Sequence, residues 1–305
     1  MNGLNEHLRA IISRFGDVEE NVPMKNLTSL RVGGMARYVV YPHDQFALVA
    51  LLDICEDNGI LHKTFGNGSN LLCSDDDYEG IIIKLNRGFN RFFIDEEEVI
   101  NVQAGYSLVS LSYDCMRMSL SGLEFASGIP GTLGGCIYMN AGAYRSSMSD
   151  VVQSVQVVCG KQIITLSNEE CEFGYRSSVF QKHPDWIIVS AVLKLKKGDK
   201  AAIKELMNER QQRRFATQPL NFPSAGSVFR NLEDHFAWQY IDMIGYRGKR
   251  YGDACVSEKH SNFIVNMGNA TASDIGRLID EICEKVRNEY NVEMITEVEK
   301  FNWKK

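Results

Sequence analysis

A glycine-rich stretch from Gly122 to Tyr144 constrains the fold of this chain more than any other segment. Glycines stand at positions 122, 128, 131, 134, 135 and 142, and small alanine and serine residues lie among them. Glycine has no Cβ, so it admits positive φ angles and a close approach of backbone. Pro130 has a fixed φ that suits a tight turn or the first turn of a helix. The apolar residues Leu133, Ile137 and Met139 follow and could line the buried side of a short helix, so a turn leading into such a helix is predicted.

The start of such a helix is a natural anion site, because its first N–H groups lack partners within the helix and its dipole favours negative charge. A second loop, Gly66-Asn67-Gly68-Ser69-Asn70, follows a predicted strand and offers a nest of backbone N–H groups. It is not a Rossmann turn, because Leu71 stands where the third glycine would be. Together the two loops indicate a phosphate-bearing cofactor. The alternative for the first stretch is a tightly packed turn, and the alternative for the Gly66 loop is a plain hairpin or a strand–helix loop.

Composition limits the classes of function. The chain has 305 residues, enough for two or three domains, and it is 44% hydrophobic and 24% charged, as is usual for a globular protein. Its net charge is −6 and it has no basic tract, which argues against nucleic-acid binding. No apolar run reaches the roughly 18 residues of a membrane span. The polar N-terminus is not a secretory signal.

The cysteine pattern argues against disulfides and metal sites. The eight cysteines form no Cys-x-x-Cys pair, and a chain of this size does not need a disulfide scaffold. We therefore expect buried, reduced thiols, a cytoplasmic protein and no bound metal.

The first two regions of the chain differ in their predicted elements. In the first, we expect a helix over residues 1–22, a strand at 36–41, a helix at 44–58 and strands at 61–65 and 80–85, which suits a small α/β domain. In the second, we expect strands at 90–94, 98–103, 151–158, 162–166 and 186–195, a helix at 108–120 and an acidic turn at 95–97. This pattern predicts an antiparallel sheet.

Residues 196–200 form the clearest linker, and a third region follows it. Helices are predicted at 200–215 and 237–244, with strands at 263–265 and 292–301. A long helix follows Thr271-Ala272-Ser273-Asp274, which resembles a capping box. The domain boundaries predicted from these regions are 1–86, 87–198 and 199–305.

Four side chains stand out as candidates for chemistry. Arg176 lies in Tyr175-Arg176-Ser177, between apolar flanks, and could hold an anion with its fork of donors, or be a surface arginine with a neighbouring acid. Ser227 lies in a turn of small residues and could donate a proton, or it could simply be a turn residue. It does not lie in the Gly-x-Ser-x-Gly motif that forms the nucleophile elbow of hydrolases. Glu297 shares a strand face with Glu293, Ile295 and Glu299, which could equally be a solvated face. His260 could be a ligand or a base, but no partner pattern accompanies it.

These motifs together resemble the UDP-N-acetylenolpyruvoylglucosamine reductase family, often called MurB, in its shorter second type. They occur in the order of the family and cover about residues 26–298. The segments that carry the resemblance are Leu30 to Gly34, Gly66 to Leu72, Gly128 to Gly135, Met139 to Tyr144, Tyr175 to Ser177, Ser224 to Asn231 and Val256 to Asn266.

The resemblance implies an α+β fold. Its two-part FAD-binding region, of the vanillyl-alcohol-oxidase-like type, would be followed by a C-terminal α+β domain for the UDP-sugar. It implies a cytoplasmic, monomeric enzyme with non-covalent FAD and with NADPH as co-substrate. In the implied reaction NADPH reduces FAD, and flavin N5 passes a hydride to the enolpyruvyl group of UDP-N-acetylglucosamine enolpyruvate. The product is UDP-N-acetylmuramate, a precursor of peptidoglycan.

The resemblance also assigns residues. Hydride addition at C3 of the enolpyruvyl ether leaves charge on C2 and its carboxylate, and positioned donors there lower the barrier. Arg176 matches the family's arginine for this task, Ser227 its proton donor to C2, and Glu297 its glutamate. The FAD contacts implied are Arg31, Gly33, Gly66, Asn67, Gly68, Ser69, Asn70, Gly131, Thr132, Gly134, Gly135, Asn140 and Ala141. The substrate contacts implied are Tyr175, Asn231, Lys259 and His260.

Three positions depart from the family pattern. Leu232 replaces a proline, Glu299 an arginine and Arg145 a glycine. Two other functions stay open at this point. One is an oxygen-using oxidase on the same flavin scaffold, for which Cys136 could attach the flavin. The other is a UDP-sugar-binding protein without catalysis.

Overall fold

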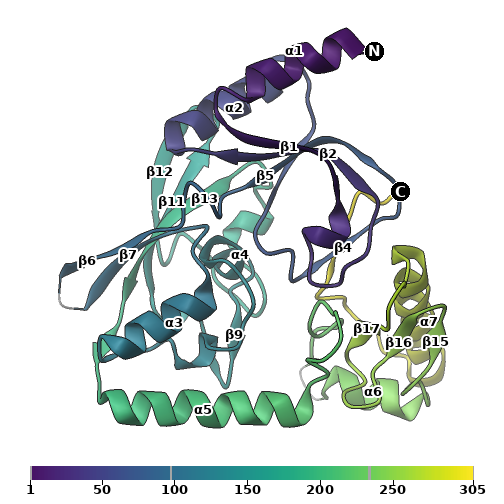
Figure 1. Ribbon diagram of the computed structural model, residues 1–305. Coiled ribbons are helices and arrows are strands. Elements are labelled where there is room, and N and C mark those ends of the chain that lie inside the picture. The colour runs from purple at the N-terminus through teal and green to yellow at the C-terminus, as the bar shows by residue number, and fades with distance from the viewer. Residues whose placement is uncertain (1, 97, 233–234, 305) are drawn as a thin grey trace. The chain divides into compact units, whose positions relative to one another are not determined.

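The computed structural model describes residues 2–96, 98–232 and 235–304 (Figure 1). The chain forms two compact units, each made of separate segments. Unit 1 comprises the residues up to Glu20, Arg37–Asn67 and Glu79–Gln211; unit 2 comprises Asn21–Ala36, Gly68–Tyr78 and the residues from Gln212 onward. The division into domains at 1–86, 87–198 and 199–305 stays a prediction.

The first sheet of unit 1 has the strand order β1-β2-β5-β3. Its strands are β1 (Gly16–Pro23), β2 (Met35–Pro42), β3 (His62–Phe65) and β5 (Tyr78–Lys84), and its helices are α1 (Asn2–Ile12) and α2 (Gln45–Asp57). The unit boundary passes through β1 and β2. Asp44 begins α2 as predicted, because its carboxylate accepts hydrogen bonds from the N–H groups of Phe46 and Ala47. β3 pairs in parallel with β5.

The helix predicted for residues 1–22 is wrong beyond Ile12, where α1 ends. The next regular element is β1, which lies beside β2. A Cβ on Gly16 would stand 2.2 Å from the carbonyl oxygen of Tyr41, so this close approach of the chain to β2 requires a glycine. Pairing with β2 thus makes residues 16–23 a strand and limits the helix to Asn2–Ile12.

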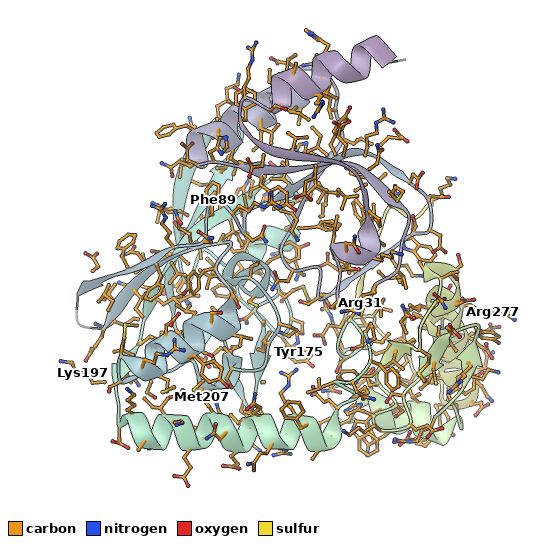
Figure 2. The ribbon with its side chains drawn as sticks, viewed as in Figure 1. Arg31, Phe89, Tyr175, Lys197, Met207 and Arg277 are labelled. Atoms are coloured by element: carbon orange, nitrogen blue, oxygen red, sulfur yellow. The ribbon has the colours of Figure 1, made fainter. Side chains whose placement is uncertain are left out.

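The second sheet of unit 1 is antiparallel, as predicted, in the order β12-β11-β13-β7-β6 (Figure 1). Its strands are β6 (Phe92–Glu96), β7 (Val99–Gln103), β11 (Val152–Cys159), β12 (Gln162–Ser167) and β13 (Ile187–Lys194). The acidic turn predicted at 95–97 includes Glu97, which lies outside the described residues. Alternating buried positions of this sheet join the core of unit 1, which also includes Phe89 (labelled in Figure 2).

Short elements connect this sheet. They are β8 (Leu120–Ser121), η2 (Glu124–Ala126), α4 (Leu133–Tyr138), β9 (Gly142–Ala143), β10 (Ser146–Ser147), η3 (Met148–Asp150), η4 (Val179–Gln181) and β14 (Lys196–Lys197). The helix predicted at 108–120 is α3 (Leu108–Arg117), which ends early because Ser119 has a φ of 59°. β8 pairs with β14, so part of the expected linker is a strand.

The helix predicted at 200–215 is α5 (Lys200–Thr217), the long green helix of Figure 1. Within unit 1, Ile203 and Met207 on α5 pack against Met116 of α3, and Met207 is labelled in Figure 2. The unit boundary lies after Gln211, inside α5.

Unit 2 packs two helices with short strands. It contains η1 (Met24–Asn26), β4 (Leu71–Cys73), α6 (Ala237–Met243), β15 (Arg250–Tyr251), β16 (Ala254–Val256), β17 (Ile264–Asn266), α7 (Ala272–Tyr290) and β18 (Glu299–Phe301). The predicted capping box is confirmed: the Thr271 hydroxyl accepts from Asp274 N–H, and the Asp274 carboxylate accepts from Thr271 N–H. β15 and β16 were not predicted, because each is too short to show an alternating pattern.

The strand predicted at 292–301 is wrong for most of its length, because β18 covers only Glu299–Phe301. The preceding residues bond to another loop of unit 2 instead. Arg230 N–H donates to the carbonyl of Ile295 over 2.9 Å, and Glu297 N–H donates to the carbonyl of Val228 over 2.7 Å. Glu297 therefore does not lie on a regular strand face.

Candidate functional site

The two glycine-rich loops meet within unit 1. A Cβ on Gly66 would stand 2.6 Å from the Oγ1 of Thr132, so only glycine allows this approach. The side-chain amide of Asn67 donates to the carbonyl of Pro130 over 3.1 Å. The sequence predicted each loop separately, and the structure brings together two loops about sixty residues apart.

The start of α4 differs from the bare helix end that the sequence suggested. Thr132 is its N-cap, and its hydroxyl accepts from Gly135 N–H over 3.5 Å. Leu133 N–H donates to the carbonyl of Tyr106 and Gly134 N–H to that of Ala104, both over 2.8 Å. The expectation of unpartnered amides is therefore wrong at these two positions, and tight packing explains part of the glycine content.

Lys84 is a residue that the sequence reasoning missed. It ends β5, is only 7% exposed, and its Nζ donates to the carbonyl of Gly66 over 2.8 Å. Burial lowers the pKa of Lys84 to about 8. This buried ammonium beside the predicted phosphate loop has no ion-pair partner among the described residues, so this part of unit 1 fits an anionic group. The signal in the sequence was a lysine directly after three isoleucines of a buried strand, Ile81–Ile83.

Arg176 occupies a strained turn in unit 1. Its φ is 53°, a left-handed value that is uncommon for arginine, and the turn closes through a bridge between Gly174 and Ser177. Its Nη2 donates to the carbonyl of Gly142 over 2.8 Å, which holds the guanidinium against the β9 segment. The neighbouring Tyr175, labelled in Figure 2, is 56% exposed.

Asn140, which is predicted to contact FAD, also ties this turn to the rest of unit 1. Its side-chain amide donates to the carbonyl of Gly174 over 2.9 Å, and its Oδ1 accepts from Ser149 N–H over 3.0 Å. Ala141 follows it and is half-buried. The side chain of Asn140 thus positions the backbone next to Arg176.

The departure at Arg145 falls in the tip of the β9–β10 hairpin. Tyr144 and Arg145 have φ values of 56° and 64°. Glycine adopts such values without strain, so the glycine usual at position 145 in the family is the less strained choice. The Tyr144 hydroxyl donates to the carbonyl of Arg210 on α5 over 2.9 Å, which fixes the hairpin.

Cys136 is unsuited to covalent attachment of a flavin. It is 3% exposed, and burial raises the pKa of its thiol to about 12. A thiol, unlike a thiolate, is a poor nucleophile. All eight cysteines are free, as predicted; six are buried and Cys159 and Cys283 are half-buried.

Unit 2 brings Ser227 and Glu297 to the same place. Glu297 N–H bonds to the carbonyl of Val228, the residue after Ser227, and the Glu297 carbonyl accepts from the side-chain amide of Asn70 over 3.0 Å. In the part of the chain that the structure describes, no group hydrogen-bonds to the hydroxyl of Ser227. That hydroxyl is half-buried and available to a ligand. Glu299, one of the three departures from the family pattern, donates its backbone N–H to the carbonyl of Asn70 over 2.9 Å.

The predicted FAD contacts in unit 2 lie on two adjoining loops. Ser29 N–H donates to the carbonyl of Gly68 over 3.2 Å, which joins the loops. Gly33 and Gly68 have φ values of 110° and 62°, and a Cβ at Gly68 would stand 2.3 Å from the carbonyl oxygen of Leu27. The other predicted contacts here, Arg31 (labelled in Figure 2), Ser69 and Asn70, lie on the same two loops.

The predicted UDP-sugar contacts of unit 2 differ in how far the protein already engages their side chains. Asn231 accepts from Ala237 N–H at the start of α6 over 3.2 Å, and Lys259 donates to the carbonyl of Phe215. His260 is half-buried, and burial lowers its pKa, so its ring is neutral at pH 7. Its buried Nδ1 has no partner among the described residues, which suits a ligand contact.

Leu232, which departs from the family's proline, donates its N–H to the carbonyl of His235 over 3.0 Å. Proline has no N–H and could not make this bond.

Arg176 belongs to unit 1, and Ser227 and Glu297 belong to unit 2. The loop from Gly66 to Asn70 crosses the unit boundary after Asn67, so it is covalently part of both units.

Sequence models of two known domains match the chain. Residues 36–165 match an FAD-binding domain, which includes the Gly66 and Gly131 loops. Residues 218–301 match the C-terminal domain of UDP-N-acetylenolpyruvoylglucosamine reductase, which includes Ser227 and Glu297. The protein is therefore an FAD-dependent oxidoreductase, with the predicted α+β fold.

Relatives and a solved structure match nearly the whole chain. It is 42% identical over 300 residues to the UDP-N-acetylenolpyruvoylglucosamine reductase of Anoxybacillus flavithermus, covering 98% of each protein. It is 39% identical to that of Bacillus subtilis, covering 93% of this chain and 94% of the relative. The crystal structure of UDP-N-acetylenolpyruvylglucosamine reductase (MurB) from Thermus caldophilus superposes with a TM-score of 0.81 at 33% identity, covering 94% of this chain and 100% of that one. The chain belongs to the UDP-N-acetylenolpyruvoylglucosamine reductase family, as its motifs predicted.

Over residues 2–96, 98–232 and 235–304, no helix is both long enough and apolar enough to span a membrane.

Proposed function

We propose that this protein reduces UDP-N-acetylglucosamine enolpyruvate to UDP-N-acetylmuramate with NADPH, a step in the synthesis of peptidoglycan precursors. The observation that carries the proposal is the 42% identity to a reductase of that name over 98% of both chains. We also propose that the enzyme is a cytoplasmic monomer whose domains span residues 1–86, 87–198 and 199–305.

We propose that FAD binds non-covalently, with its diphosphate against the two glycine-rich loops. The contact of Gly66 with Thr132 and the buried charge of Lys84 support this placement. When bound, FAD supplies hydride transfer, accepting two electrons from NADPH and passing them to the substrate. The chain's own residues must then bind the substrate, stabilise its negative charge and supply a proton.

Arg176 is proposed to bind the substrate carboxylate. Hydride addition at C3 places negative charge on C2 and on that carboxylate, and a fixed donor fork stabilises it most as the charge develops. The bond from Nη2 to the Gly142 carbonyl holds the guanidinium in one orientation. We propose that Tyr175, Asn231, Lys259 and His260 contact the UDP-sugar.

Ser227 is proposed to donate the proton to C2. A hydroxyl is a weak acid, but the intermediate to be protonated is an enolate or carbanion and therefore a strong base. The backbone N–H of Glu297 bonds to the carbonyl of Val228, which holds Glu297 beside this turn. We propose that its carboxylate acts there as a second electrostatic group or as a proton relay. After the reaction Ser227 must recover a proton, and the half-exposed turn allows one to arrive from water or from Glu297.

We expect the purified protein to be yellow and to release all of its flavin as FAD on heating or acid treatment. NADPH should be consumed in equal amount to the enolpyruvyl substrate, and UDP-N-acetylmuramate should be the product by mass spectrometry. Flavin retained by the denatured chain, or FMN in its place, would contradict non-covalent FAD. Oxygen uptake with an alcohol would indicate an oxidase, and substrate binding without NADPH turnover would indicate a binding protein.

Gly66→Ala should weaken FAD binding about 10- to 100-fold, because overpacking costs roughly 1–3 kcal/mol. The new Cβ would stand 2.6 Å from the Oγ1 of Thr132 and displace the loop. FAD dissociation constants from fluorescence titration of the apoprotein measure this effect. In the Thr132→Ala background the same substitution should cost much less, since the opposing oxygen is gone. An equal cost in both backgrounds would show that this contact does not set the loop position.

A further inference from the structure

Lys84 is a buried cation with an incomplete set of partners. An ammonium group has three N–H donors. Within the described part of the chain, the Nζ of Lys84 has one hydrogen-bond acceptor, the carbonyl of Gly66 at 2.8 Å, and it forms no ion pair within 4.0 Å. The side chain is 7% exposed, so water has little access to the remaining donors. Leaving buried donors of a charged group unsatisfied is costly.

The fold places this cation beside the Gly66 loop. Lys84 is the last residue of β5 and pairs in parallel with Phe65, the last residue of β3. Because parallel strands end at the same sheet edge, the Gly66 loop starts where the Lys84 side chain reaches. All of these residues belong to unit 1.

The charged neighbours of Lys84 pair with one another and not with its ammonium. Glu19 on β1 favours its charged form, whereas Arg87, after β5, opposes it. Glu19 is itself engaged by the guanidinium of Arg87 and by the hydroxyl of Tyr41 on β2, and Asp17 pairs with Arg87. Both carboxylates thus pair with Arg87, and neither forms an ion pair with the ammonium of Lys84 in the described part of the chain.

Holding the Gly66 carbonyl in place does not by itself explain why the residue at position 84 is a buried lysine. A neutral donor could satisfy the Gly66 carbonyl without the cost of burying a charge. A buried charge becomes favourable when an anion binds close to it.

We propose that Lys84 is a positioning residue of the cofactor site: one N–H of its ammonium holds the Gly66 carbonyl, and its charge and remaining donors bind the FAD diphosphate. This inference rests on the proposed placement of the diphosphate at the two glycine-rich loops.

A pH dependence follows from this assignment. In the protein alone, burial holds the pKa of Lys84 at about 8. A diphosphate nearby favours the ammonium and raises that pKa, so FAD binding takes up a proton when the pH is near or above 8. FAD affinity should be highest below pH 8 and fall as the pH rises above it.

The test is FAD binding to the apoprotein of wild type, Lys84→Met and Lys84→Gln between pH 7 and 9.5. At pH 7 both variants should bind FAD about 10- to 100-fold more weakly, the usual effect of losing a hydrogen bond to a charged group. Lys84→Gln keeps a donor for Gly66 but loses the charge, so it separates anchoring from electrostatics. In calorimetry at pH 8 in two buffers of different ionisation enthalpy, wild type should take up part of a proton and both variants none.

Lys63→Met is the matched control, because Lys63 lies on the adjacent β3 and is half-buried without an ion pair among the described residues. It should bind FAD like wild type. If both Lys84 variants keep wild-type affinity and pH dependence, the inference is wrong, although the proposed function stands. If Lys84→Gln binds normally and only Lys84→Met is weak, Lys84 is an anchor without an electrostatic role and the inference is overturned. Failure of wild type itself to bind FAD would instead contradict the proposed function.

Discussion

Replacing Ser227 with alanine should slow reduction of the enolpyruvyl substrate by about 10²–10⁴-fold, the usual cost of losing a positioned general acid. Reduction of bound FAD by NADPH needs no proton from Ser227 and should stay near the wild-type rate. The substitution removes one hydroxyl that has no partner among the described residues, so unit 2 should fold normally. Its backbone link to Glu297 through the Val228 carbonyl does not depend on the side chain.

The two half-reactions are separated by stopped-flow absorbance. The enzyme is reduced with NADPH under anaerobic conditions and then mixed with the enolpyruvyl substrate. Ser227→Cys should recover part of the rate, because a thiol is a stronger acid than a hydroxyl. Ser224→Ala is the matched control, since it removes a hydroxyl from the same turn that has no proposed role. If Ser227→Ala reacts at nearly the wild-type rate, water or Glu297 supplies the proton and Ser227 is not the donor.

Arg176→Lys should slow the same half-reaction by about 10²–10³-fold, comparable to the loss of one donor from an oxyanion site. Lysine keeps the positive charge but lacks the planar fork, so it cannot both hold the Gly142 carbonyl and bind a carboxylate in a fixed geometry. Reduction of FAD by NADPH should change little, because that step leaves no negative charge on the enolpyruvyl group.

The measurement is again the rate of each half-reaction over a range of substrate concentrations. Arg145→Lys is a suitable control, because Arg145 is exposed on the neighbouring hairpin and keeps its left-handed backbone in the variant. Slowing of both half-reactions to the same extent would mean that Arg176 maintains the turn from Gly174 to Ser177 and does not act on the substrate.

Local signals in the sequence predicted much of the fold. Asp44 before α2 and the Thr271–Asp274 box before α7 are helix starts whose hydrogen bonds join neighbouring residues, so the sequence alone identifies them. The strands of the five-stranded sheet were also predicted, because alternating apolar residues match a sheet with one face in the core.

Predictions failed where distant segments decide the local structure. Residues 292–298 were predicted to belong to the last strand, but they bond to residues 228–230 in place of a strand ladder. Residues 16–22 were included in the predicted first helix, but pairing with β2 makes them part of a strand. In both cases the residues that determine the structure are distant in the sequence, so no local pattern predicts the contact.

The order of residues along the chain was enough to predict the family, the two glycine-rich loops and the residues proposed for chemistry, because all of these depend on residue type and spacing. Only the folded chain shows which of those residues contact one another. It alone set Gly66 against Thr132, used the amides of Leu133 and Gly134 within the protein, and joined Ser227 to Glu297 through Val228. It also buried Lys84 beside the Gly66 carbonyl. The physical reason is that burial and hydrogen bonding depend on distances between segments, and folding alone fixes those distances.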